Sequence, residues 1–386
     1  MNLVELTKLA KVDKTAAEGG VLEFVQQAFP DLGIQTAQIN RSAVSLNSVN
    51  GFLTSASAEY FFKFHAEENE TVTVNEYYNS EILSEVSLPV IKPLYQSTKP
   101  GSQFLIYEKI SAPTAFELLP QRPADFFKAE EQLLQQVQQT YLSTLEMTES
   151  ELLANAPLYQ LFYHRLVGEQ PRVQLFYLSN PWFQSIMDKP WVINGKSYNY
   201  SLRQLIETST KLLNPRHYLN QPSVIGHGDD HNGNKFFIDG TFKFFDPAFA
   251  GRQPALLSFV KATAHNSFVH PDWLYTPEQL VPNGLTIEWD SAADKMMVQH
   301  NWDVQTRDPN RLRELQLQET IIWKPLIGEL RQRGWLPDDW KDYLRCALFC
   351  CPFLVYNLLD PKRYTQDTSV LALSKCIELA SYDCNY

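Results

Sequence analysis

The first hundred residues alternate apolar and polar positions in the manner of a small β-rich unit. Residues 1–30 carry apolar side chains at helical spacing, and from Ile34 the pattern changes to that of strands. Strands are expected at 42–47, 51–57, 59–65, 90–95 and 103–108, with a helix at 74–85 before the last two. The first two strands would flank a polar turn at 47–51.

After residue 110 the pattern becomes mainly helical. Apolar residues recur at three and four positions through 123–147, which predicts an amphipathic helix. Further helices are expected at 150–166, 200–214, 309–333, 337–357 and 366–381, with β elements at 223–246 and 285–302. The chain is therefore predicted to be an α+β protein with a β-rich N-lobe at 1–107 and a helical C-lobe at 108–386.

Charge and cysteine content limit the binding partners and the cellular compartment to be expected. The 33 basic and 44 acidic residues give a net charge of −11, which argues against nucleic acid or an anionic membrane as the main partner. All five cysteines follow residue 345, without metal-ligand spacing, and are expected to be buried free thiols. The amino terminus has no signal-like apolar run, so a cytoplasmic location is expected.

The chemistry is concentrated between residues 224 and 252. A short apolar strand leads into the loop His227-Gly228-Asp229-Asp230-His231-Asn232-Gly233-Asn234, and Asp239-Gly240 between apolar runs predicts a β-hairpin. The hairpin would bring Asn234, at the start of its first strand, close to Asp246, which follows its second. Asp229 would lie on the loop immediately before them.

This spacing matches what phosphoryl transfer requires. Mg²⁺ prefers oxygen ligands and binds a triphosphate with one or two protein side chains, here Asn234 and Asp246. A separate carboxylate, Asp229, is placed to accept the proton of an acceptor hydroxyl. In kinases a catalytic Asp precedes the metal-binding Asn by five positions, and a second Asp follows, which is the spacing of Asp229, Asn234 and Asp246.

The segments HGDDHNGN and FFDPAFAG resemble those of the aminoglycoside phosphotransferase and choline kinase superfamily, which has a protein-kinase-like fold. The resemblance implies that Asp229 is the catalytic base, that Asn234 and Asp246 bind Mg²⁺, and that ATP or another nucleoside triphosphate is the donor. The acceptor would be a hydroxyl of a small molecule, and the net acidity is compatible with a cationic one. Pro247 follows Asp246 where the family usually has Trp or a small residue, which leaves the subfamily open.

The N-lobe contains matching candidates for nucleotide binding. Lys63, alone among aromatics in EYFFKFH, is predicted to contact the phosphates, although a lysine that protects an edge strand would look the same. The resemblance favours Glu76 as its partner, with Glu81 and Glu85 as alternatives. Ser48 and Asn50 are expected in a phosphate-covering loop, and Tyr107 and Glu108 where an interlobe segment would contact adenine.

Other residues allow more than one interpretation. His227 is expected to orient the loop through backbone hydrogen bonds, and Asp230 and His231 to shape it or face solvent. The segment 265–275, with Trp273, is a candidate acceptor wall or else core packing. Two other functions are open: a nucleotide-binding pseudokinase, and a metal-dependent phosphohydrolase using the loop's His and Asp side chains.

Overall fold

The structure is a computed structural model that describes residues 3–40, 49–64, 76–97, 104–269, 271–292 and 294–386. These residues form two compact units, Met1–Glu81 with Val90–Ala112, and Ile82–Pro89 with Pro113–Tyr386. The predicted division between residues 107 and 108 falls inside strand β5, near the end of the first unit. Among the described residues, no helix combines the length and apolar character needed to cross a membrane.

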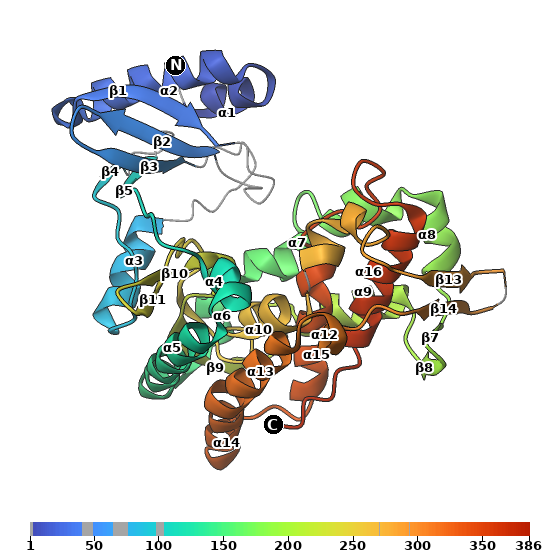
Figure 1. Cartoon of the computed structure of the whole chain (residues 1–386). Helices are drawn as coiled ribbons and strands as arrows, with labels where there is room; N and C mark the ends of the chain where they lie inside the picture. The colour runs from blue at the N-terminus through green and yellow to red at the C-terminus, as the bar shows by residue number, and fades with distance from the viewer. Residues whose placement is uncertain (1–2, 41–48, 65–75, 98–103, 270, 293) are drawn as a thin grey trace. The chain divides into compact units, whose positions relative to one another are not determined.

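The first unit is an antiparallel sheet covered on one face by helices. The strand order is β1-β2-β3-β5-β4. The strands are β1 (Ile34–Ile39), β2 (Val49–Ser55), β3 (Glu59–Phe64), β4 (Tyr95–Ser97) and β5 (Phe104–Glu108). Helices α1 (Leu3–Val12) and α2 (Lys14–Ala28) lie along the covered face (Figure 1). Helix α3 (Glu76–Glu85) continues from this unit into the second.

An aromatic cluster holds this sheet to its helices. The rings of Phe62, Phe64 and Phe104 stack with centroids 5.4–6.2 Å apart, against Val21 and Val25 of α2. Neighbouring residues of a strand point to opposite faces. The alternation of β3 therefore directs Phe62 and Phe64 into this core and Lys63 to the opposite face of the sheet.

One turn and one strand predicted for this unit are wrong. The expected polar turn at 47–51 overlaps β2, which already includes Asn50 and Gly51, while 42–47 lies outside the described residues. The strand expected at 90–95 is replaced by β4, which begins at Tyr95. Pro93 explains the second error because proline has no N–H to donate to a strand ladder.

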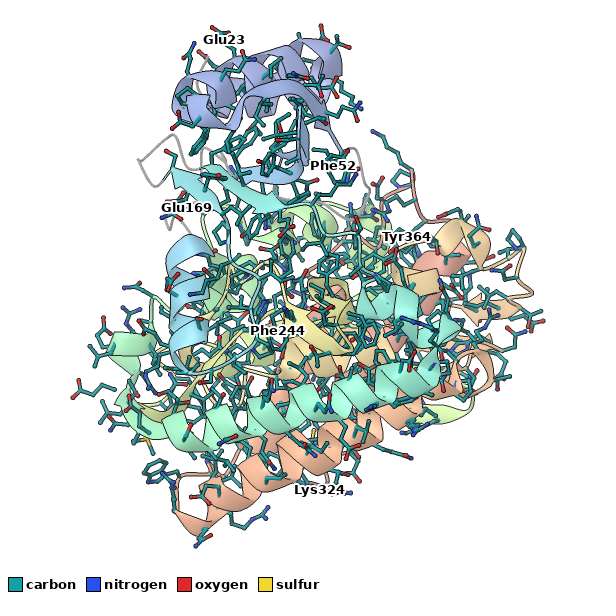
Figure 2. The ribbon with its side chains drawn as sticks, turned by 60° about the vertical axis from the view of Figure 1, so that its left-hand side comes forward. Glu23, Phe52, Glu169, Phe244, Lys324 and Tyr364 are labelled. Atoms are coloured by element: carbon teal, nitrogen blue, oxygen red, sulfur yellow. The ribbon has the colours of Figure 1, made fainter. Side chains whose placement is uncertain are left out.

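The second unit is mainly helical. Its longest helix, α5 (Pro123–Thr144), is amphipathic as predicted and packs beside α14 (Lys324–Gln332), which starts at the Lys324 labelled in Figure 2. The other α-helices are α4 (Ala115–Gln121), α6 (Ser150–Leu153), α7 (Tyr163–Val167), α8 (Pro181–Ile186), α9 (Leu202–Leu212), α10 (Val260–Thr263), α11 (Pro271–Leu274), α12 (Val304–Arg307), α13 (Pro309–Gln318), α15 (Trp340–Phe353) and α16 (Gln366–Leu379). Shorter helical turns are η2 (Pro157–Leu161), η3 (Gln174–Leu178), η4 (Asn232–Asn234), η5 (Ala264–Phe268), η6 (Pro277–Gln279) and η7 (Glu319–Trp323).

Three small sheets complete this unit. Their strands are β6 (Glu146–Glu149), β7 (Trp191–Ile193), β8 (Lys196–Tyr198), β9 (Asn220–Gly226), β10 (Lys235–Ile238), β11 (Thr241–Phe244), β12 (Gly251–Pro254), β13 (Ile287–Asp290) and β14 (Met296–His300). The predicted hairpin is present: β10 and β11 pair antiparallel across Asp239 and Gly240, whose φ angles are 51° and 80°. Positive φ at both central residues matches a right-twisted two-residue turn, for which Asp-Gly is well suited. All five cysteines are buried and free, as expected.

Candidate functional site

The segment from His227 to Asn234 connects two strands as an ordered loop. It leaves β9 at Gly226, passes Asp229 and enters β10 through the turn η4. Gly228 has a φ of 81°, and a Cβ there would lie 2.7 Å from the Phe249 carbonyl oxygen. Glycine is thus required for both conformation and space, and it turns the chain so that Asp229 comes next.

Backbone and amide hydrogen bonds bring the three predicted residues together. The Asn234 side-chain amide donates to the Asp229 carbonyl at 2.8 Å, and the Phe245 N–H donates to the Asn234 carbonyl at 2.8 Å. Asp246 follows Phe245 directly and has a φ of 56°, a conformation that asparagine and aspartate tolerate better than most residues. The hairpin therefore places Asn234 beside Asp246, with Asp229 bonded to the same segment.

His227 ties the loop to the hairpin, as the sequence predicted. Its Nε2 lies 2.9 Å from the Phe245 carbonyl oxygen, and its Nδ1 accepts from the Asp229 N–H at 3.3 Å. Because Nδ1 accepts a hydrogen bond and Nε2 faces a carbonyl oxygen, the proton of the His227 ring is on Nε2. The ring also packs 4.9 Å from that of Phe244, which is buried in this unit (Figure 2). His227 thus orients the loop through its backbone.

The charge environment favours an ionised Asp229. One of its carboxylate oxygens, Oδ1, lies 3.5 Å from the Lys261 ammonium and 3.9 Å from His231 Nε2. Burial acts to raise the pKa of Asp229, but Lys261 and its other cationic neighbours outweigh burial and hold that pKa below its usual value. Burial lowers the pKa of His231 to about 4, so this imidazole is neutral near pH 7.

Behind the loop lies a buried polar network that sequence reasoning missed. Lys235 Nζ bonds both carboxylate oxygens of Glu130 at 2.7 and 2.8 Å, and the two side chains are 2% and 1% exposed. The Asn232 amide donates to Glu314 at 3.1 Å, and burial raises the pKa of Glu314 to about 8. These bonds anchor the residues on either side of Asn234 to α5 and α13.

Burial decides between the alternatives left open for two residues around the loop. Asp230 is 2% exposed and therefore does not face solvent, and burial raises its pKa to about 7. Trp273 is fully buried and packs 6.5 Å from Trp302, so it belongs to the core and is not an acceptor wall. Within the same predicted segment, His265 bonds the Tyr275 hydroxyl at 3.2 Å, and its ring lies 5.8 Å from that of His231.

In the first unit, Lys63 lies on the sheet face opposite the aromatic core. It is 4% exposed and pairs in register with Asn50 on β2 and Leu105 on β5. Two residues further along the same face, the half-buried rings of Phe52 and Phe61 are 6.0 Å apart. One face of this sheet thus combines an amide, an ammonium and an aromatic pair, which suit phosphates and a flat ring respectively.

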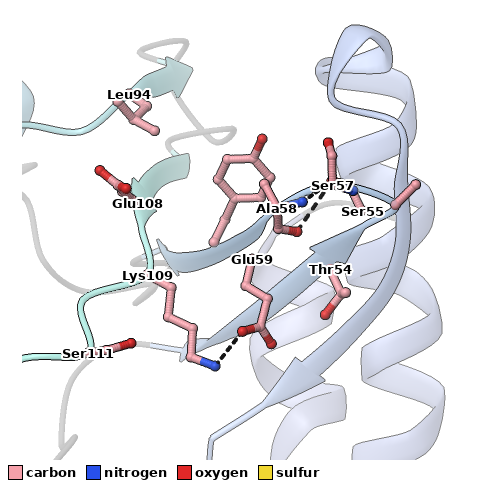
Figure 3. A pocket seen from close by; sticks show the side chains of 11 residues that line it. Thr54, Ser55, Ser57, Ala58, Glu59, Leu94, Glu108, Lys109 and Ser111 are labelled. Atoms are coloured by element: carbon pink, nitrogen blue, oxygen red, sulfur yellow. Dashed lines mark hydrogen bonds and ion pairs between the residues drawn. The ribbon is translucent and has the colours of Figure 1, made fainter.

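A shallow cavity of about 770 Å³ opens at the end of this sheet (Figure 3). Glu108, one of the predicted nucleotide-contacting residues, lines it together with the ion pair between Lys109 and Glu59, whose atoms are 2.8 Å apart. Tyr107 is fully buried and its ring is 6.4 Å from that of Phe61. The cavity is therefore lined in part by charged side chains, and it adjoins the segment expected to contact adenine.

The partner predicted for Lys63 is not settled within the described residues. Glu76 begins α3, but its side chain lies outside them, as does the whole of Ser48. The alternative Glu81 forms an exposed ion pair with Lys92 at 2.9 Å. Glu81 is thus engaged elsewhere, and Glu76 stays a prediction.

The donor set of the loop suits Mg²⁺ bound together with a nucleotide. Among the described residues, no three His, Cys, Asp or Glu side chains gather closely enough to hold a metal by themselves. Mg²⁺ on a triphosphate needs only one or two protein oxygens. The Asn234 amide nitrogen is used by Asp229, which directs the amide oxygen away from that bond, and Asp246 adds a carboxylate next to it.

Comparisons with known proteins give structural likeness only. No family model and no curated protein matches the chain. The structure is similar to a spectinomycin phosphotransferase solved with ADP and spectinomycin, at 14% identity and a TM-score of 0.45, covering 94% of this chain and 97% of that one. It is also similar to an amicoumacin kinase, at 15% identity and a TM-score of 0.47, covering 89% of this chain and 88% of that one. A third similar structure is a choline kinase from Cryptosporidium parvum, at 8% identity and a TM-score of 0.42, covering 94% of each chain.

Proposed function

We propose that the protein is a small-molecule kinase that transfers the γ-phosphoryl group of ATP, or of another nucleoside triphosphate, to a hydroxyl. One observation carries the proposal: Asp229, Asn234 and Asp246 are joined through the loop and hairpin by the hydrogen bonds from Asn234 to Asp229 and from Phe245 to Asn234. The proposal gives this arrangement a proton acceptor next to two oxygen ligands for Mg²⁺.

In this proposal each residue has one task. Asp229 accepts the proton of the acceptor hydroxyl, and its lowered pKa keeps it ionised at neutral pH. Asn234 and Asp246 hold Mg²⁺, which neutralises charge on the triphosphate when bound. The hydrogen bonds of His227 to Phe245 and Asp229 keep the loop and hairpin aligned before any ligand arrives.

The first unit would contribute nucleotide binding. Lys63 would contact phosphate oxygens, with Asn50 beside it, and the Phe52 and Phe61 rings would face the base. Ser48, Glu76, Tyr107 and Glu108 remain predicted contacts of the nucleotide. This division of tasks rests on the shared sheet face of Lys63, Asn50 and the aromatic pair.

The acceptor is proposed to be a small hydroxyl compound. The net charge of −11 favoured a cation, but among the described ion pairs the cationic group closest to the Asp229 carboxylate is the Lys261 ammonium. Positive charge at this end of the site gives a cationic acceptor no support. The metal-dependent phosphohydrolase considered from the sequence would hold its metal with a cluster of His and Asp side chains, and the described residues form no such cluster.

The test is an ATP-consumption screen against a library of metabolites and aminoglycosides, paired with thermal-shift assays. A kinase is expected to consume ATP with a subset of hydroxyl compounds and to be stabilised by ATP only when Mg²⁺ is present. A pseudokinase would show the stabilisation without consumption. Consumption that is independent of any acceptor, with inorganic phosphate as product, would indicate a hydrolase and contradict the proposal.

A further inference from the structure

Lys261 occupies an unusual position beside Asp229. It lies in α10, far along the chain from the loop, and is only 5% exposed. Its ammonium is 3.5 Å from Asp229 Oδ1, an oxygen that is itself buried and accepts no hydrogen bond. Among the contacts of the described residues, the ammonium has this ion pair and no hydrogen bond.

A second buried lysine shows how a purely structural pair looks in this protein. Lys235 bonds both oxygens of Glu130 at 2.7 and 2.8 Å, the length expected for charge-assisted hydrogen bonds. The Lys261 pair is longer and leaves donors of the ammonium available. The donors of Lys261 are thus available to a ligand in a way that those of Lys235 are not.

Resting on the proposed function, we infer that Lys261 is a further catalytic residue whose ammonium binds an oxygen of the phosphoryl group during its transfer. The bond from phosphorus to the β-phosphate oxygen breaks, and a bond to the acceptor oxygen forms. The acceptor proton passes to Asp229, and Lys261 keeps its own protons. The products are a phosphomonoester and the nucleoside diphosphate.

Position and charge both support this assignment. The acceptor oxygen must lie within hydrogen-bond reach of Asp229 and in line with the phosphorus. A cation 3.5 Å from Asp229 is then close to the non-bridging oxygens, where negative charge is spread in the transition state. A donor already in place before the reaction stabilises that charge without reorganisation.

The experiment compares binding of Mg·ADP with binding of Mg·ADP plus aluminium fluoride, a mimic of the transferring phosphoryl group, by calorimetry. Lys261→Met should bind Mg·ADP as the wild type does, within about twofold, and bind the fluoride complex at least tenfold more weakly. Turnover should fall about a hundredfold, the scale for losing one preorganised donor. Lys261→Arg keeps the charge, and should retain more activity than Lys261→Met but less than the wild type.

Lys375→Met is the matched control, because Lys375 is 9% exposed and pairs with Glu378 at 2.8 Å in α16. It should leave the fluoride complex and turnover unchanged. Equal affinity of wild type and Lys261→Met for the fluoride complex would overturn the assignment, as would an equal loss of affinity for both complexes. A wild-type protein that neither binds Mg·ADP nor consumes ATP would refute the kinase proposal itself.

Discussion

The loop of the second unit and the sheet of the first hold their functional candidates in different ways. Asp229, Asn234 and Asp246 are linked by hydrogen bonds of 2.8 Å through the loop and hairpin. One buried ion pair and one buried amide hydrogen bond anchor this segment from behind. Lys63 is placed instead by strand alternation, with an aromatic core behind it and Asn50 and Leu105 at its sides.

This difference indicates that the loop of the second unit serves catalysis and the sheet of the first unit serves nucleotide binding. A network of short bonds fixes atoms to the accuracy that proton and phosphoryl transfer need. A sheet face presents charge and flat surface, which suits ligand binding. Changes in the loop should therefore reduce turnover, and changes on the sheet should mainly reduce nucleotide affinity.

The largest effect is expected from Asp246→Ala. Because Asp246 is the only charged metal ligand proposed, both turnover and Mg²⁺-dependent nucleotide binding should be lost, as measured by calorimetry with Mg·ATP. Alanine is strained at a φ of 56°, so Asp246→Asn, which tolerates this conformation, serves as the backbone control. Unchanged Mg·ATP binding in both variants would show that Asp246 does not hold the metal.

Asp229→Asn should reduce turnover at least about a hundredfold, the usual scale for a positioned base. Nucleotide affinity should change little, because Asp229 faces the acceptor in this account. Asp239→Asn, in the turn of the same hairpin, is the matched control and should have normal activity. A near-normal rate of Asp229→Asn on the true acceptor would remove this residue from the mechanism.

Lys63→Ala should weaken ATP binding while adenosine binding survives, because the lost contacts are to phosphates. Lys63→Arg should also be impaired, since a forked guanidinium does not replace a compact ammonium. Lys92→Ala, which breaks an exposed ion pair in the same unit, should bind ATP normally. If Lys63→Ala bound ATP with wild-type affinity, Lys63 would not contact the phosphates and the contrast between the two units would fail. The edge-strand alternative is already excluded, because β3 pairs with β2 on one side and β5 on the other.

Asn234→Ala should act more mildly than Asp246→Ala. It removes one neutral oxygen and the 2.8 Å bond to the Asp229 carbonyl, so the Mg²⁺ concentration needed for half-maximal turnover should rise. A magnesium titration of wild type and variant measures this shift. Identical titration curves would contradict the assignment of Asn234 to the metal.

The smallest effect concerns the network behind the loop. Burial raises the folded-state pKa of Glu314 to about 8, above its ordinary value of 4.5. Its stabilising contribution is therefore present below about pH 4.5 and is lost as pH rises to about 8. Melting temperatures of Glu314→Gln should fall less than those of the wild type over this interval, and parallel curves would show that Glu314 does not titrate there.

The sequence predicted the hairpin because the signals are local. Asp239-Gly240 specifies the turn, and two paired strands then determine which residues meet, so Asn234 and Asp246 could be placed together without tertiary information. Lys63 could be named as a candidate because a single charge between Phe62 and Phe64 breaks an apolar strand, and its contact with phosphates stays a prediction.

Residues that reach the site from distant elements were missed. Glu130 and Glu314 join Lys235 and Asn232 across more than 80 positions of sequence, which no periodicity reveals. Lys261 could have been named as a candidate from the sequence, because it is the only charged residue in the apolar run LLSFVKATA, just as Lys63 is a single charge between two phenylalanines. The role of Trp273 stayed open in the sequence because an aromatic residue after Asp246 looks the same whether it packs in a core or faces a ligand.

The most direct test follows the label from ATP marked at its γ-phosphorus, in the presence of Mg²⁺ and an acceptor found by the screen. The account predicts that the label appears in a phosphomonoester of the acceptor with the wild type, and at least about a hundredfold more slowly with Asp229→Asn. Label recovered only as inorganic phosphate, or equal rates for the two proteins, would contradict it.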